Sequence, residues 1–178
     1  TLRTTPRGFY GMLLGHIGIA FFIIGVTFVS MFHIEKDLRM TPGDTFEMAG
    51  YTFKFNGVRM TDVANYQAAR GDFEVTDESG FYASMAPEKR VYLVQQNPMT
   101  EAAIDAGLTR DLFIALGEQV GNDGSWAIRI YFKPFIRWIW LGALIMAFGA
   151  FLAGTDKRYR KMVRRENELP ANAAGSAA

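Results

Sequence analysis

The sequence has no cysteine and only two histidines, His16 and His33, among its 178 residues. A chain without cysteine forms no disulfides and offers no thiolate nucleophile and no cysteine-ligated metal site. Between residues 45 and 135 there is also no histidine, no glycine-rich phosphate loop and no nucleophile elbow. The central part of the chain therefore carries little recognisable catalytic chemistry, and the two histidines become the first candidates for a site.

Acidic residues outnumber basic ones in the middle of the chain and are scarce at its ends. Residues 33–134 hold 10 Lys/Arg and 15 Asp/Glu, which gives a net charge of −5, whereas the other positions hold 9 and 3, which gives +6. An acidic middle argues against nucleic acid as a partner. Basic ends are typical of segments that stay on the cytoplasmic side of a membrane.

Two long apolar runs predict two transmembrane helices. Residues 10–32 are almost continuously apolar, and a helix of this length would extend about 34 Å, enough to cross the lipid bilayer. The second run, residues 135–154, begins with Arg137, Trp138 and Trp140, which is typical of the membrane interface. We expect both segments to lie in lipid.

The positive-inside rule then sets the expected topology. The lead-in, residues 1–9, and the tail, residues 155–178, are basic and are predicted to be cytoplasmic, with the end of the tail disordered. The acidic domain, residues 33–134, is predicted to lie on the opposite side, in the periplasm of a Gram-negative bacterium. The protein would be a multi-pass inner-membrane protein.

The acidic domain alternates apolar and polar residues as β-strands do. We expect a membrane protein of the α+β class, with a small antiparallel β barrel or sandwich of about six strands between the two helices. The predicted strands are 51–55, 72–76, 80–85, 90–94, 111–116 and 126–133, the last two joined by a turn at Asn122-Asp-Gly.

One short helix is expected inside this domain, at residues 101–106. Thr100 is suited to cap its N-terminus and Gly107 its C-terminus. Glu101 and Asp105 would then stand one turn apart, and a solvated helix face is a better interpretation of them than a catalytic acid pair.

His16 is the only ionisable residue in the first apolar run. In a helix with 100° per residue, His16 shares one side with Met12, Ile23, Thr27 and Ser30. A second stripe along the helix consists of Gly11, Gly15, Gly18 and Gly25. Two interpretations stay open: an interhelical hydrogen bond, or a cofactor ligand. His33 is better interpreted as a solvated residue at the membrane boundary.

An imidazole inside a membrane is suited to ligate haem iron. Haem of this kind needs a second axial ligand, and His33 lies about 25 Å along the chain direction from His16. A bis-histidine site would thus require a ligand from another chain or from a segment that this sequence does not include.

Several segments resemble one known family. YGMLLGHIG, EKDLRMTPGD, PEKRVY, MTEAAIDAGLTRDLFIALGE and the block from WAIRIYFKPF to DKRYRK are similar to the C-terminal part of the cytochrome c maturation protein F (CcmF) family. The resemblance extends to about Arg165. These proteins are haem lyases of the bacterial inner membrane and of mitochondria.

The resemblance implies that His16 is an axial ligand of a membrane b-type haem (haem b), which reduces the haem that is attached to apocytochrome c. It also implies partners: the remaining CcmF segment or chain with the second axial histidine, CcmH- and CcmI-type proteins, the haem chaperone CcmE, and apocytochrome c. Without the upstream segment the chain would be one part of a lyase, either a split-gene product or a fragment.

Two alternatives to this hypothesis stay open. The first is a non-catalytic membrane scaffold that assembles other maturation proteins, in which case His16 would contribute nothing to haem binding. The second is a b-type electron-transfer subunit that oxidises quinol, although a stand-alone cytochrome would carry both of its ligands.

Overall fold

The computed structural model describes residues 6–94, 96–121 and 123–156. These residues divide into two compact units, one made of the chain up to residue 26 and from residue 138 onward, the other of residues 27–137. The elements, in chain order, are α1 (Arg7–Phe32), β1 (Ile34–Met40), β2 (Thr45–Met48), β3 (Tyr51–Val63), β4 (Tyr66–Asp77), β5 (Gly80–Met85), β6 (Glu88–Tyr92), β7 (Pro98–Glu101), β8 (Ala103–Ala106), β9 (Arg110–Gln119), β10 (Trp126–Pro134) and α2 (Ile136–Gly154).

The two helices are long and apolar enough to cross a membrane. Helix α1 begins at Arg7, three residues before the predicted span, and continues to Phe32; α2 covers Ile136–Gly154. Most of their large apolar side chains are exposed in the protein itself, among them Ile23 and Leu144. This is the surface expected of helices whose solvent is lipid rather than water.

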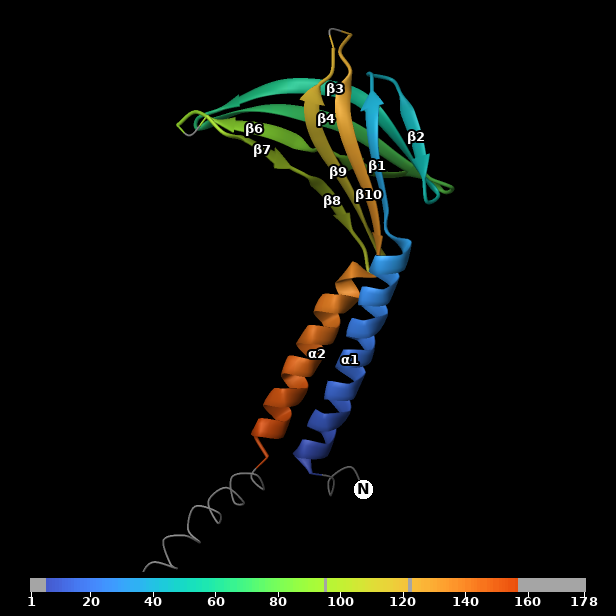
Figure 1. The fold of residues 1–178 in the computed structure, drawn as a ribbon, viewed down its shortest axis with the longest axis vertical. Helices are drawn as coiled ribbons and strands as arrows, with labels where there is room; N and C mark the ends of the chain where they lie inside the picture. Colours follow the sequence, from blue (N-terminus) through green and yellow to red (C-terminus); the bar gives the residue numbers. More distant parts are fainter. Residues whose placement is uncertain (1–5, 95, 122, 157–178) are drawn as a thin grey trace, which may run out of the picture. The chain divides into compact units, whose positions relative to one another are not determined.

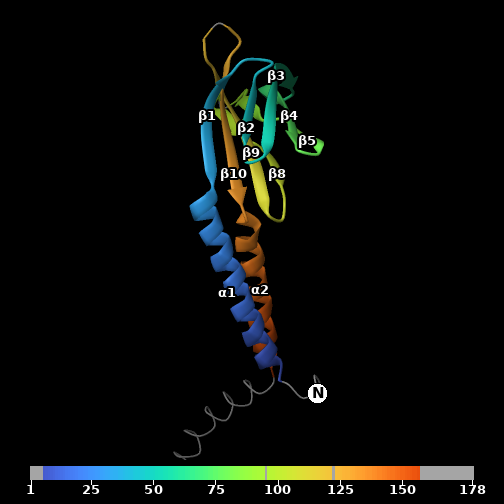
Figure 2. The ribbon, with the colours of Figure 1, turned by 90° about the vertical axis from the view of Figure 1, so that its right-hand side faces the viewer.

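The strands form two antiparallel sheets that pack face to face, which confirms the predicted sandwich (Figures 1 and 2). The first sheet has the order β1-β10-β9-β8, and the second has the order β2-β3-β4-β6-β7 with β5 also paired to β4. Alternate residues of each strand point into the space between the sheets. The fully buried side chains there include Phe53, Phe55, Phe73, Val75, Leu112, Ile114, Leu116, Ile128 and Ile130.

The predicted helix at residues 101–106 is wrong. The segment instead belongs to β7 and β8, which are separated only by Ala102. Strand β7 pairs with β6 in the second sheet, whereas β8 pairs with β9 in the first. Six residues make an unstable helix, and the two pairings satisfy the backbone more completely than one helical turn would.

The six predicted strands are present, but several are longer than expected and others were missed. Strand β1 is not among the predicted strands, because Glu35, Lys36, Asp37 and Arg39 hide its alternation. Its partner β10 supplies the pairing that makes it a strand, with Leu38 opposite Ile128. Asn122 of the predicted turn lies outside the described residues, as do residues 157–178 of the basic tail and residues 1–5 of the lead-in.

Candidate functional site

Three glycines of α1, namely Gly11, Gly18 and Gly25, are buried. A Cβ atom at Gly18 would lie 2.7 Å from the carbonyl oxygen of Gly142, and one at Gly11 would lie 2.6 Å from that of Gly149. Real Cβ atoms are not found at such distances, so the backbones of α1 and α2 approach each other because these positions lack side chains. The spacing of seven residues on both helices keeps the contact on one side of each.

His16 lies on the other side of α1. It is exposed, and on a helix it stands about 160° from Gly18 and about 180° from Gly25. Three glycines of the predicted stripe, Gly11, Gly18 and Gly25, therefore lie opposite His16, whereas Gly15 has no atom within 4 Å of its would-be Cβ. The interhelical hydrogen bond considered for His16 is not made with α2.

The His16 ring is oriented by its own helix. Its Nδ1 lies 2.8 Å from the carbonyl oxygen of Met12, and because a carbonyl only accepts, Nδ1 carries the proton and donates it. The neutral ring then has its lone pair on Nε2. A backbone carbonyl that fixes the tautomer in this way is the usual second partner of a metal-ligating histidine.

His33 makes a similar bond, from Nδ1 to the carbonyl oxygen of Val29 at 3.1 Å. It directly follows the last residue of α1, however, and is exposed at the end of the apolar segment. His16 and His33 are 17 residues apart in the sequence.

A carboxylate that follows the end of α2 is hydrogen-bonded to the start of α1. The backbone N–H of Gly8, in the first turn of α1, donates to Oδ2 of Asp156 at 2.9 Å, and Asp156 is only 7% exposed. An acidic group at a helix N-terminus satisfies a free N–H and interacts favourably with the helix dipole. Sequence reasoning assigned Asp156 to the basic tail and missed this role.

Within the sandwich, Arg110 is the most buried cation of the described residues. The Cζ atom of its guanidinium lies over the rings of both Tyr51 and Tyr82, at 4.8 and 4.7 Å from their centroids, and the group donates a hydrogen bond to Asp105 at 2.5 Å. Burial alone would lower the pKa of Arg110, but the Asp105 carboxylate and the Tyr51 hydroxyl raise it above its ordinary value. The group ties β9 of one sheet to β3 and β5 of the other.

The acid pair considered at Glu101 and Asp105 is absent, because the two residues belong to different sheets. Glu101 interacts with Arg90 at 3.5 Å, and Asp105 with Arg110. Among residues 6–94, 96–121 and 123–156, no three His, Cys, Asp or Glu side chains gather as a metal site would require.

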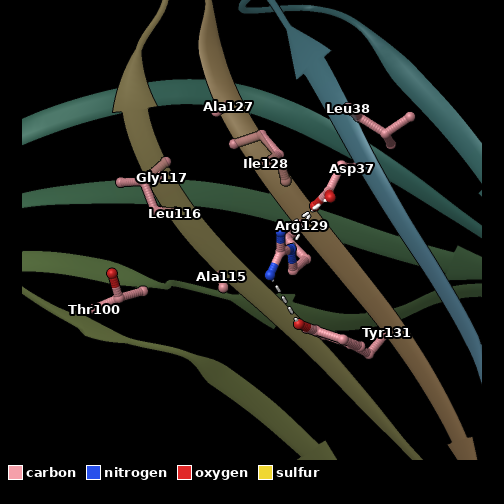
Figure 3. Close-up of a pocket in the computed structure, with 10 residues that line it drawn as sticks. All are labelled: Asp37, Leu38, Thr100, Ala115, Leu116, Gly117, Ala127, Ile128, Arg129 and Tyr131. Atoms are coloured by element: carbon pink, nitrogen blue, oxygen red, sulfur yellow. Dashed lines mark hydrogen bonds and ion pairs between the residues drawn. The ribbon is translucent and has the colours of Figure 1, made fainter.

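One hollow of about 430 Å³ lies on the first sheet (Figure 3). Arg129 projects beside it and is held by the carboxylates of Asp37 and Glu35. Ala115 and Ala127 line the hollow, and their small side chains leave it unfilled.

These features define a class of membrane protein in which two apolar helices flank an antiparallel β-sandwich in the sequence. The first helix carries a histidine, His16, on the side that the second helix does not cover. The family described as the CcmF C-terminal beta-sandwich matches residues 31–134. The chain belongs to the CcmF family of cytochrome c-type biogenesis proteins.

The CcmF protein of Pseudomonas aeruginosa is 46% identical over 176 residues, which cover 99% of this chain and 27% of the relative. That of Escherichia coli K12 is 41% identical over 93% of this chain and 26% of its own length. A solved structure titled Cytochrome c Heme Lyase CcmF has the same fold, with a TM-score of 0.69 and 17% identity over 83% of this chain and 24% of that one. The chain thus spans about a quarter of the length of these relatives.

Proposed function

We propose that this chain is the C-terminal part of a cytochrome c haem lyase and that His16 supplies one axial ligand to a haem b in the inner membrane. The observation that carries the proposal is the orientation of His16. Its Nδ1 donates to Met12 and its Nε2 lone pair remains available on the helix side that α2 does not cover. Such an imidazole fits one axial position of a haem iron.

The same orientation supports a second part of the proposal. A ligand on the open side of α1 meets whatever packs there, so the second axial histidine comes from the rest of the CcmF protein, of which this chain spans a quarter. When bound, haem supplies one-electron redox chemistry. This chain's own contribution is to orient the His16 ring and to hold α1 against α2 through the glycines.

We place the β-domain in the periplasm. The start of α1 and the end of α2 then lie on the cytoplasmic side, in accordance with the basic charge near both ends of the sequence. The partners that follow from the family are a haem chaperone of the CcmE type, apocytochrome-binding proteins of the CcmH and CcmI type, and apocytochrome c. The acidic, ion-paired surface of the sandwich is suited to docking other proteins.

A scaffold without a haem role is the second candidate. One observation is compatible with it: the described residues of the β-domain contain no cluster of His, Asp or Glu that could hold a metal ion. The scaffold and lyase-subunit functions differ in what they require of His16.

The test is a reduced-minus-oxidised absorption spectrum of the purified membrane complex containing this chain. We expect His16→Ala to abolish the b-type band while the partner proteins remain on a gel, because one axial ligand is lost. His33→Ala is the matched control and should keep the band. Loss of the band in neither variant would favour the scaffold; loss in both would show that the spectrum reports assembly rather than ligation.

A further inference from the structure

The turn between β8 and β9 is tied to the start of α2. The N–H of Phe135, the residue directly before α2, donates to the carbonyl oxygen of Thr109 at 2.8 Å. Two residues further on, Nε of Arg137 donates to Oδ1 of Asp111 at 3.3 Å, and the same oxygen accepts a hydrogen bond from the N–H of Gly107 at 3.1 Å. The β8–β9 turn, residues 107–109, therefore has a defined place beside the first turn of an apolar helix.

The end of α1 belongs to the same joint. Phe135 has a φ of 54°, in the left-handed region that is costly for a bulky residue. Its ring packs edge-on against that of Phe28 in α1, with the centroids 4.9 Å apart. Such a backbone conformation persists where the surrounding contacts determine it. The β8–β9 turn, the end of α1 and the start of α2 are thus packed together within the unit formed by residues 27–137.

The first turn of α2 also marks where the membrane begins. Arg137 and Trp140 are three residues apart, which is about 4.5 Å along a helix axis. Arginine and tryptophan at the end of an apolar segment are typical of the interface between water and lipid. The headgroup layer on each side of the hydrocarbon core is roughly 5–8 Å thick. A turn that is hydrogen-bonded to Phe135 and Arg137 therefore lies at the level of the headgroups.

The β8–β9 turn has the chemistry of a segment that contacts lipid. Residues 106–109 carry no charge, and Leu108 is 78% exposed. The acidic residues on either side of the turn, Asp105 and Asp111, are each paired with an arginine. A leucine side chain is more stable among acyl chains than in water, and the paired carboxylates do not repel anionic headgroups.

We propose that a lipid surface is the partner of this end of the β-domain, with the β8–β9 turn in the headgroup layer and the Leu108 side chain inserted toward the acyl chains. Apolar side chains of surface-bound segments enter the boundary between headgroups and acyl chains by about 5–10 Å. The contact gives the β-domain a third attachment to the membrane beside the two helices. The inference goes beyond the proposed haem function and does not depend on it.

Val94 provides a matched control. It lies between β6 and β7, and it is 94% exposed. Residues 98–106, which form β7 and β8, lead from that connection to the β8–β9 turn, an extended length of up to about 30 Å. The two exposed apolar residues at the ends of this run therefore separate a contact with lipid from the general tendency of apolar side chains to adhere to it.

The absence of cysteine permits single-cysteine labelling. Leu108→Cys and Val94→Cys would each carry a nitrobenzoxadiazole fluorophore, with the full chain in vesicles of phosphatidylcholine and phosphatidylglycerol. Thr109→Cys, at the exposed neighbouring position, is a second labelling site in the same turn. The quenchers are a phosphatidylcholine with a nitroxide near the headgroup end of its acyl chain, and iodide in the water.

We expect nitroxide lipid to remove about half of the fluorescence from the label at Leu108→Cys, because a side chain about 5–10 Å below the headgroup surface comes within reach of the nitroxide. Thr109→Cys should be quenched in the same way, and Val94→Cys should not. Iodide should have the opposite effect, quenching the label at Val94→Cys more than the labels in the turn.

Three results would overturn the proposal. If iodide quenches both turn labels and nitroxide lipid does not, the turn lies in water. If neither quencher reaches them, protein rather than lipid covers the turn. If nitroxide lipid quenches Val94→Cys equally, the label itself adheres to the vesicle. None of these measurements involves haem, so this proposal and the haem proposal stand or fail separately.

Discussion

His16 and His33 make the same local hydrogen bond but lie in different surroundings. Each donates from Nδ1 to the carbonyl four residues earlier. His16 does so within the apolar part of α1, where a polar ring is costly unless it binds something, whereas His33 follows the helix end. The surroundings, rather than the bond, make His16 the candidate ligand.

Arg110 should be essential for the stability of the β-domain. Replacing it with alanine leaves the Asp105 carboxylate half-buried without its cation and removes two ring contacts. We expect the free energy of unfolding to fall by about 3 kcal/mol, as is usual when one partner of a largely buried pair is removed. Urea unfolding followed by near-ultraviolet circular dichroism measures it, because Tyr51 and Tyr82 contribute to that signal.

Arg59→Ala is the matched control for this prediction. Arg59 also pairs with an aspartate, Asp72, but its side chain is 72% exposed. Its removal should change the unfolding midpoint little, since exposed ion pairs contribute little. An equal loss for both variants would contradict the special role assigned to Arg110.

The β-domain should lose stability in acid. The hydrogen bond from Arg129 lowers the pKa of Asp37, and that from Ser125 lowers the pKa of Asp123, from an ordinary value of 3.8. A carboxyl whose pKa is lower in the folded state stabilises above its unfolded pKa, and this contribution disappears as the pH falls through the folded value. The melting temperature should thus be level from about pH 8 to pH 5 and fall below about pH 4.

Melting curves monitored by circular dichroism at several pH values provide the check. Asp37→Asn should flatten the acid-side decrease. A melting temperature that rises on acidification would contradict the assignment of these ion pairs.

At the scale of elements, the contact between α1 and α2 depends on glycine. Gly18→Ala would place a methyl group 2.7 Å from the carbonyl oxygen of Gly142, so the helices would have to separate. We expect a loss of about 1–3 kcal/mol, the usual cost of overpacking a close contact. Titration with sodium dodecyl sulfate, followed by the fluorescence of Trp138 beside Phe21, measures the loss.

Gly15→Ala is the control within the same helix. No atom lies within 4 Å of its would-be Cβ, so the substitution should leave the helix pair intact. If Gly15→Ala destabilised the pair as much as Gly18→Ala, the effect would come from the helix backbone rather than from packing.

The same two helices show what sequence can and cannot establish. Their length and composition are local properties, and both were predictable from the runs at 10–32 and 135–154. The side of α1 that faces α2 was not predictable, because the sequence does not distinguish Gly15 from Gly18. Only the structure shows that Gly18, and not Gly15, packs its Cα face against Gly142 of α2.

The β-domain gives a parallel lesson. Alternation predicted the strands that carry Phe53, Phe55, Ile128 and Ile130, and all four of these side chains are buried. Residues 101–106 carry helix-forming side chains, yet pairing with two different sheets overrides that local preference. The Arg110 site combines strands distant in sequence, and no local pattern indicated it.

At the scale of the whole molecule, the chain covers about a quarter of the length of its relatives. In the proposed function, the second ligand of the haem bound at His16 therefore comes from outside this chain. In this account the proposed function belongs to an assembly, to which the chain contributes one imidazole, a helix pair and a β-sandwich.

Chemical rescue of His16 tests the central claim most directly. In the complex with His16→Gly, the b-type absorption band should be lost, and added imidazole should restore it by occupying the vacated ligand position. His33→Gly, with and without imidazole, should behave as the unmodified complex does. A His16→Gly complex that keeps its b-type band without imidazole would contradict the account, because the iron would then be ligated by another residue.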